Sequence, residues 1–449
     1  MPLHSDHIRL HLANGPATAK KLQQKLQVSQ PTLSRALAQL GNDVVRTGAG
    51  RSIQYLLRDH ARGFDDIPVY RVDAQGQLHP LGVLTPVRPD GFVMRQTNGQ
   101  TLYSEGMPWW LIDMRPQGFL GRAYASRHAA HLGLPASVRE WSDTDAMRAL
   151  LAHGHEAVGN LLLGERARAH FLDAPPPASI ATPNKTNAYT ALAQRALQGD
   201  TPMSSAGGEQ PKFTTVADTP NGVRHVLVKF SLPDDNAITE RWRDLLLAEH
   251  HALETLRRAG IGAAQSWVLD HNGQRFLEVE RFDRVGDNGR CGLFSLSALE
   301  AEFVGQAQTA WPVLVELLAQ QGVVNSAATA TTQQLFAFGR LIGNSDMHTG
   351  NLSFVGDGGR PYALAPAYDM LPMAFAPHSG GGLTHHLPPL ELHPSVAHSV
   401  WHAMLPVARD YLNRLLQDER FSGNFAPCLT ALGEHLNTAN RSIARLGYK

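Results

Sequence analysis

The stretch GNSDMHTGNLSF, residues 343–354, and the following LAPAYDML, residues 364–371, carry the strongest signal in the chain. They place Asp346 and Asn351 five positions apart and put a second carboxylate, Asp369, after the next apolar run. Carboxylate and amide oxygens are the ligands that a hard cation such as Mg²⁺ prefers. We therefore expect Asn351 and Asp369 to hold Mg²⁺.

Histidines close to this stretch raise the alternative of a zinc site. His348 lies between Asp346 and Asn351, and the pair His385-His386 follows further along the chain. The 22 histidines, however, are spread over the whole sequence rather than gathered here. We therefore expect His348 to orient the loop or to contact a nucleotide, not to bind zinc.

Upstream, a lysine and a glutamate fit the same kind of site. Lys229 lies in HVLVKFS, residues 225–231, an apolar strand-like run in which a lysine is costly to bury unless it faces an anion. Glu249, on the amphipathic run of residues 244–261, is placed to pair with it. Glu254 on the same run is the competing partner, and an edge-strand lysine without this role is the alternative.

Two further segments would complete a nucleotide site. SSAGGEQPKF, residues 204–213, is a Gly-containing loop whose backbone N–H groups can cradle phosphates. Its candidate contacts are Ser205, Ala206, Gly207, Gly208, Gln210 and Lys212. FLEVERFDR, residues 276–284, predicts a strand that leads into an extended hinge able to bind adenine through its backbone. The candidate hinge residues are Glu280, Arg281 and Phe282.

These segments follow one another in the order found in protein kinases: Gly loop, strand lysine, helix glutamate, hinge, Asp/Asn loop and metal-binding Asp. The spacing of Asp346 and Asn351 also equals that of the kinase catalytic loop. Each motif alone is weak, but their common order favours an ATP-dependent kinase. In that reading Asp346 accepts the proton of the substrate hydroxyl.

The N-terminal region has a different character. Residues 1–62 hold nine Lys/Arg and three Asp, a net charge of +6, although the whole chain has 40 basic and 40 acidic residues. Residues 17–27 and 30–40 show leucines at helical spacing, with Ser29 placed to cap the second helix. Two β-prone runs over residues 44–57 predict a hairpin. Together they predict a winged helix-turn-helix.

A basic winged helix-turn-helix predicts binding to double-stranded DNA. The side chains expected at base edges or phosphates are Gln30, Thr32, Ser34 and Arg35 on the second helix and Arg46 and Arg51 on the wing. Because one module reads only a short half-site, tight binding implies a homodimer on a palindrome. The alternative is a helical dimerisation module with a solvated basic surface.

Composition limits the rest of the chain. Of 449 residues 43% are hydrophobic, two are cysteine, and no run approaches the ~20 apolar residues of a membrane span. We expect a cytoplasmic protein without a membrane partner. Residues 65–178 predict a small α+β subdomain, in which Trp109 and Trp110 belong to a core or an interface. Proline-rich residues 173–183 separate it from a catalytic region over residues 184–449.

A family can now be named. SSAGGEQPK, VLVKF, VERFDR, NSDMHTGN and AYDML together resemble the HipA family of serine/threonine kinases, the toxin halves of bacterial type II toxin–antitoxin pairs. The resemblance is strongest to the YjjJ-like branch, which carries a fused N-terminal DNA-binding domain. It implies an α+β, protein-kinase-like two-lobed fold whose C-terminal lobe is mainly helical. It also implies that ATP and Mg²⁺ are used to phosphorylate a protein, with a translation component as one candidate substrate.

The resemblance further implies regulation. In this family a serine at the head of the Gly loop can be autophosphorylated, which expels the loop and switches activity off. That role falls on Ser205, with its neighbour Ser204 as the second candidate. Typical members borrow DNA binding from a separate antitoxin, so the fused module leaves open whether a separate antitoxin exists. A growth-inhibiting, autoregulating kinase is the leading reading, and a regulator that only senses nucleotide or a small-molecule kinase are the alternatives.

Overall fold

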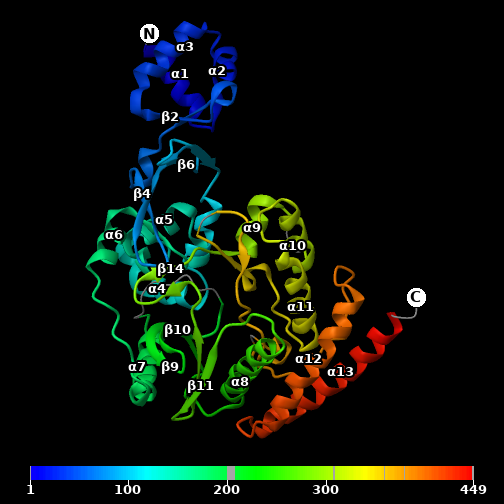
Figure 1. The fold of residues 1–449 in the computed structure, drawn as a ribbon. Coiled ribbons are helices and arrows are strands. Elements are labelled where there is room, and N and C mark those ends of the chain that lie inside the picture. Colours follow the sequence, from blue (N-terminus) through cyan, green and yellow to red (C-terminus); the bar gives the residue numbers. More distant parts are fainter. Residues whose placement is uncertain (1, 200–207, 307–308, 358, 379, 447–449) are drawn as a thin grey trace.

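The structure of the chain is a computed structural model that describes residues 2–199, 208–306, 309–357, 359–378 and 380–446. Three units follow one another: a small N-terminal unit that projects from one end, a middle unit, and a two-lobed C-terminal region (Figure 1). Helices alternate along the chain with strands that pair into antiparallel sheets, so the expected α+β class is confirmed. No helix among the described residues has the length and apolar character needed to cross a membrane.

The N-terminal unit consists of three helices and a small antiparallel sheet. The helices are α1 (Pro2–Leu12), α2 (Ala19–Leu26) and α3 (Gln30–Leu40), and the sheet has the order β1 (Ala17–Thr18), β3 (Gln54–Leu57), β2 (Val44–Thr47). The side-chain oxygens of Thr18 and Ser29 cap α2 and α3. Both predicted helices and the hairpin are present, whereas α1 was not expected. It contributes fully buried Ile8 and Leu12 to the core of the unit.

The middle unit is built on a five-stranded antiparallel sheet. Its order is β7 (Thr101–Ser104), β6 (Gly91–Gln96), β5 (Leu78–Val87), β4 (Ile67–Val72), β8 (Leu161–Leu163). The helices of this unit are α4 (Gly118–Leu132), α5 (Asp143–His153) and α6 (Gly164–Asp173). Ser142 and Asp145 form a capping box at the start of α5. Buried Phe92, Tyr124 and Trp141 lie in the core between sheet and helices.

A second antiparallel sheet forms the first lobe of the C-terminal region. Its order is β11 (Ser266–His271), β12 (Gln274–Glu280), β10 (Gly222–Phe230), β9 (Lys212–Thr219). Helices α7 (Lys185–Leu197) and α8 (Ala237–Arg258) accompany this sheet. Val226, Val228 and Phe230 alternate along β10 into a buried cluster, so Lys229 between them must face the opposite side of the sheet.

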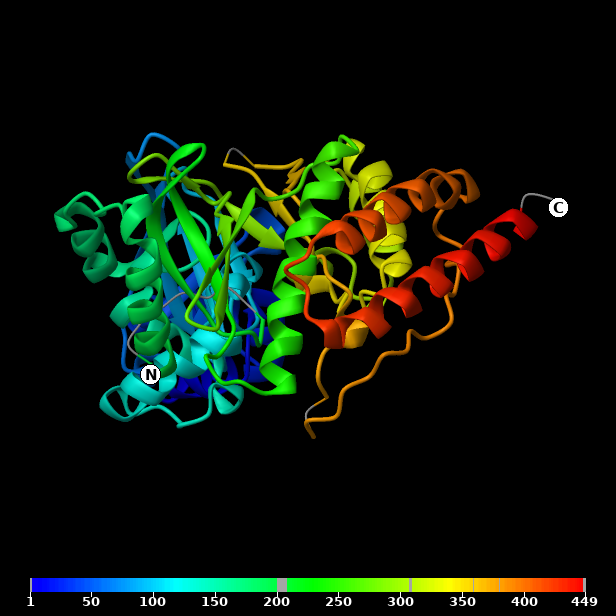
Figure 2. The same ribbon diagram turned by 90° about the horizontal axis from the view of Figure 1, so that it is seen from below.

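The second lobe is mainly helical. Its helices are α9 (Leu296–Phe303), α10 (Trp311–Gln320), α11 (Ala327–Leu341), α12 (His398–Gln417) and α13 (Ala426–Leu446). The remaining strands are β13 (Arg284–Val285) with β14 (Gly289–Arg290), and the sheet β15 (Leu293–Ser295), β16 (Ser353–Val355), β17 (Ala363–Leu364). Helix α8 lies between the sheet of the first lobe and helices α12 and α13 (Figure 2). Its buried Leu245, Leu253 and Leu256 belong to the core of the helical lobe.

Apolar and polar contacts join the three units. Val45 and Leu56 of the N-terminal hairpin share a buried cluster with Val87 and Val93 of the middle sheet. Trp109 of the middle unit packs against Phe294, with ring centroids 5.2 Å apart. Trp109 therefore lies at an interface, as expected.

Candidate functional site

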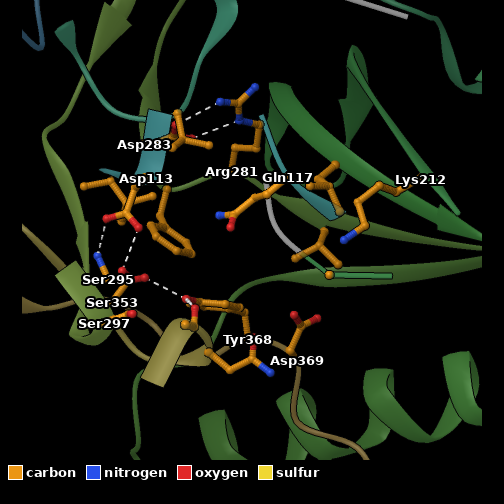
Figure 3. A pocket seen from close by; sticks show the side chains of 18 of the residues that line it. Asp113, Gln117, Lys212, Arg281, Asp283, Ser295, Ser297, Ser353, Tyr368 and Asp369 are labelled. Carbon is orange, nitrogen blue, oxygen red and sulfur yellow. Dashed lines mark hydrogen bonds and ion pairs between the residues drawn. The ribbon is translucent and has the colours of Figure 1, made fainter. Parts of the chain in front are cut away.

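A cavity of about 360 Å³ lies where both lobes of the C-terminal region meet the middle unit (Figure 3). Most of the predicted nucleotide-site residues line it: Gly208, Lys212, Lys229, Glu249, Glu280, Arg281, Phe282, His348, Asn351 and Asp369. They come from strands, a helix and loops spread over 162 positions of the sequence. The fold therefore brings together residues that the sequence could relate only through their order.

Lys229 joins two carboxylates at the base of the cavity. Its Nζ donates to both carboxylate oxygens of Glu249, at 2.7 and 2.8 Å, and to Oδ1 of Asp369. Lys229 is 4% exposed and Glu249 is 1% exposed. Burial alone would lower the pKa of Lys229, but the charges of Asp369 and Glu249 raise it above its ordinary value. Glu254 instead pairs with Arg257 and Arg258 on the same helix, so Glu249 is the partner of Lys229.

A second lysine lies beside this cluster. Lys212 pairs with Lys229 across the β9–β10 ladder, and its side chain points into the cavity (Figure 3). Burial lowers the pKa of Lys212 to about 8, although the charge of Asp369 opposes this shift. Two lysines therefore lie side by side at one end of the cavity, next to the carboxylates of Glu249 and Asp369.

Asp369 is held in an unusual backbone conformation. Its φ is +51°, in the left-handed region that non-glycine residues rarely adopt. The amide of Asn344 donates to the Asp369 carbonyl at 3.3 Å, and its oxygen accepts from the N–H of Asp346 at 3.0 Å. Asn344 thus ties the Asp346 loop to Asp369. No role was predicted for Asn344, although it lies only two positions before Asp346.

In the predicted catalytic loop, the side chain of Asn351 is hydrogen-bonded to the backbone of Asp346. Asn351 donates from its amide nitrogen to the Asp346 carbonyl at 2.9 Å, which leaves its amide oxygen turned away from that bond. The ring of His348 accepts from the N–H of Gly350 at 3.0 Å, so it orients the loop. The Asp346 carboxylate is half exposed, and the cavity lining does not include it. It is therefore accessible to a substrate that approaches from solvent.

The hinge lies across the cavity from this loop. The backbone N–H groups of Glu280 and Arg281 donate to Gln265 and His225 at 2.9 Å. Within the described part of the chain, the backbone N–H of Phe282 makes no such bond to a carbonyl. The Arg281 guanidinium pairs with buried Asp283, which in turn pairs with Arg284. Arg281 and Arg284 outweigh the effect of burial and hold the pKa of Asp283 well below its usual range.

The middle unit contributes residues that the sequence analysis did not consider. Asp113 and Gln117 line the cavity, and Asp113 accepts from the hydroxyl and the N–H of Ser295, each at 2.6 Å. Tyr368, next to Asp369, donates to the Gly350 carbonyl at 2.9 Å. No motif marks these residues, because they reach the site only through tertiary packing.

Some predicted residues are not placed in the cavity. Ser204, Ser205, Ala206 and Gly207 lie outside the described residues. Gln210 is described, and it is not among the residues that line the cavity. Their proposed roles stay predictions.

The predicted DNA-contacting residues lie on the N-terminal unit. Gln30, Ser34 and Arg35 are exposed on α3, and Thr32 is partly exposed. Arg46 is exposed on β2, with its guanidinium 5.7 Å from the centre of the Tyr55 ring. The side chain of Arg51 lies outside the described residues. Beside Arg46, Thr47 is buried and donates to the hydroxyl of Thr101 in the middle unit, so one face of the hairpin is an interface within the chain.

Comparison with known proteins identifies the family. A family model described as the middle domain of a YjjJ-like toxin matches residues 64–172, and one described as a HipA-like C-terminal domain matches residues 204–407. These matches define the class as a HipA-like toxin. Toxin YjjJ of Escherichia coli (strain K12) is 41% identical over 438 residues, which cover 97% of this chain and 98% of that protein. The chain therefore belongs to the YjjJ-like toxins, as the resemblance predicted.

Two solved structures show a weaker likeness. One is a chain from the complex of HipA, HipB and operator DNA of the Shewanella oneidensis MR-1 toxin–antitoxin system, with a TM-score of 0.49 and 14% identity. The alignment covers 85% of this chain and 97% of that chain. The other is the proinflammatory kinase CtkA of Helicobacter pylori, with a TM-score of 0.37 and 12% identity, covering 54% of this chain and 94% of that chain.

Proposed function

We propose that the protein is a serine/threonine protein kinase that uses ATP and Mg²⁺, and that its N-terminal unit binds double-stranded DNA. The observation that carries the kinase proposal is the cluster in which Lys229 contacts both Glu249 and Asp369 at the base of the cavity. A buried lysine between two carboxylates, next to a second lysine, is an arrangement suited to phosphates with a bound cation.

The cavity fits Mg²⁺ and ATP by the chemistry of its donors. Lys229 contacts Oδ1 of Asp369, which leaves Oδ2 as a ligand, and the amide oxygen of Asn351 is the second candidate. No three His, Cys, Asp or Glu side chains among the described residues are grouped to hold a metal ion. Mg²⁺ would therefore depend on phosphate oxygens of ATP for its remaining ligands, where it would neutralise their charge.

Different residues of the chain would bind the phosphates, accept the proton and position the catalytic loop. Lys229 and Lys212 bind phosphate oxygens, and Glu249 keeps Lys229 in place. Asp346 accepts a hydrogen bond from the substrate hydroxyl and takes its proton. His348 and Asn351 hold the loop that carries Asp346. The acceptor is a protein serine or threonine, because the exposed position of Asp346 suits a large substrate, with a translation component as one candidate.

The DNA part of the proposal rests on the exposed polar face of α3. Gln30, Ser34 and Arg35 are exposed at the start of a capped helix, and Arg46 lies on the adjoining hairpin. This geometry suits a winged helix-turn-helix with α3 in the major groove. A homodimer on a palindrome, in the cytoplasm, would let a growth-inhibiting kinase repress its own synthesis. Autophosphorylation at Ser205 or Ser204 would switch its activity off.

Incubation with labelled ATP and Mg²⁺, alone and with cell lysate, tests the kinase proposal. Asp346→Asn should lower phosphoryl transfer by about 10²–10⁴-fold while Mg·ATP affinity stays close to wild type. Asp410→Asn is the matched control, because its carboxylate is equally half exposed but lies on α12. Asp369→Asn should weaken both transfer and Mg·ATP binding, since it removes a charge from the metal site.

The outcomes separate the alternatives. Equal transfer by wild type and Asp346→Asn would mean that the active site is misplaced. Tight Mg·ATP binding without any transfer by the wild type would favour a nucleotide-sensing regulator. Label found only on a small molecule in the lysate would favour a small-molecule kinase.

A further inference from the structure

The first turn of α4, in the middle unit, touches the start of the segment that leads into β9. The N–H of Phe119 donates to the carbonyl of Gly208 at 2.9 Å. Gly208 lies directly against the ammonium of Lys212, because a Cβ added to Gly208 would come within 2.8 Å of that nitrogen. A contact chain thus runs from the middle unit, through Gly208, to a lysine of the cavity.

Gly118 leaves no room for a side chain at this contact. A Cβ there would lie 2.5 Å from the Gly208 carbonyl oxygen, closer than a Cβ can approach, and 3.0 Å from the Gly208 nitrogen. Its φ of +60° also suits glycine. The backbone of α4 can therefore approach Gly208 only because residue 118 is glycine.

Neighbouring side chains strengthen the same junction. Phe119 packs edge-on against Phe230 at the end of β10, with ring centroids 6.4 Å apart. Arg122, one turn further along α4, forms an ion pair with Glu209. Gln117, just before the helix, lines the cavity, and Figure 3 shows its side chain between Arg281 and Lys212.

We propose that the first turn of α4 is a positioning element of the nucleotide site: it fixes Gly208 and thereby sets Lys212 against the phosphates. The proposal rests on the proposed function, because it assigns a task to a unit that lies outside the kinase-like lobes. In consequence the C-terminal region alone does not hold a complete nucleotide site. The middle unit acts on affinity for the nucleotide rather than on the proton transfer at Asp346.

A pair of glycine substitutions, one at each end of α4, tests this. Gly118→Ala and Gly133→Ala both place alanine at positive φ, +60° and +64°, but Gly133 has no atom within 4 Å of its added Cβ. Both variants should carry a similar backbone strain. Only Gly118→Ala should displace Gly208. We expect it to weaken Mg·ATP binding by about tenfold to a hundredfold in calorimetric titration of the full chain.

The kinetic pattern and a charge swap give independent readouts. Gly118→Ala should raise KM for ATP while kcat at saturating ATP falls much less, and Gly133→Ala should resemble the wild type. Arg122→Glu places a second negative charge beside Glu209, so it should weaken Mg·ATP binding. The double variant Arg122→Glu with Glu209→Arg restores the ion pair and should restore the affinity. Because both side chains are exposed, the swap should not disturb folding, so it also serves if Gly118→Ala does not fold.

Two results would overturn the proposal. One is equal Mg·ATP affinity in Gly118→Ala and Gly133→Ala, both folded. The other, should Gly118→Ala not fold, is unchanged affinity in Arg122→Glu. A wild type that binds no Mg·ATP at all would instead refute the proposed function, and this proposal with it.

Discussion

Arg35 and Arg46 of the N-terminal unit are exposed to solvent, whereas Lys229 and Glu249 of the cavity are buried against each other. Exposed charges act on a partner one by one, through attraction that salt screens. Buried charges act as a unit, since removing one leaves another unpaired in a poorly solvated place. The two regions should therefore differ in how strongly they respond to substitution and in whether stability changes with function.

The largest effect is expected from Lys229→Met. It leaves buried Glu249 and partly exposed Asp369 without the cation that joins them, so we expect the free energy of unfolding to fall by about 3–5 kcal/mol. Mg·ATP binding should be lost as well. Denaturant unfolding and calorimetric titration measure the two quantities.

Lys185→Met is the matched control for that variant. Lys185 is also buried and pairs with buried Glu278 at 2.7 Å, but it does not line the cavity. It should lose similar stability and keep its affinity for Mg·ATP. Loss of nucleotide binding in both variants to the same degree would show that Lys229 has only a structural role.

A smaller effect is expected from Arg35→Ala on α3. If Arg35 reaches a base edge, DNA affinity should fall by about 1–3 kcal/mol and sequence preference should relax, with unchanged stability. Arg258→Ala, which removes an equally exposed arginine from α8, should leave DNA binding unaltered. Fluorescence anisotropy with operator and random DNA measures both. Point variants are preferable to deleting residues 1–62, which would expose Val87 and Val93.

Arg46→Ala tests whether the hairpin of the N-terminal unit contacts DNA phosphates rather than bases. A phosphate contact from the hairpin predicts a fall of about fivefold in affinity for every sequence and a salt slope smaller by about one. Anisotropy titrations at several salt concentrations give that slope. A change of sequence preference in Arg46→Ala, but not in Arg35→Ala, would exchange the two assignments.

The two regions also differ in how far the sequence predicted them. Helices α2 and α3 follow from leucine spacing and from the cap at Ser29, because local periodicity and capping act within a few residues. The pairing of Lys229 with Glu249 followed from motif order, and the structure shows it. Helix α1 was not predicted, because Ile8 and Leu12 are its only described residues in the buried core of the unit.

What the sequence could not predict depends on tertiary packing. Asp113 and Gln117 reach the cavity from the middle unit, and no local pattern relates them to Lys212. The burial of Lys212, which shifts its pKa, likewise follows from its neighbours in space. The tight contact of Gly118 with Gly208 likewise exists only in the folded chain.

The smallest expected effect concerns pH and the lowered pKa of Lys212, about 8. Lys212 attracts phosphate only while protonated, so affinity should be full below this pKa and decline as pH rises through it. Between about pH 7.5 and 8.5 the protonated fraction changes by roughly threefold, which sets the expected loss of Mg·ATP affinity. Lys212→Arg should remove this dependence, because a guanidinium stays charged. Lys212→Met should bind more weakly at every pH, without the decline. An equal decline in wild type and Lys212→Arg would assign the titration to another group, and would leave Lys229, with its raised pKa, as the cation that holds the nucleotide.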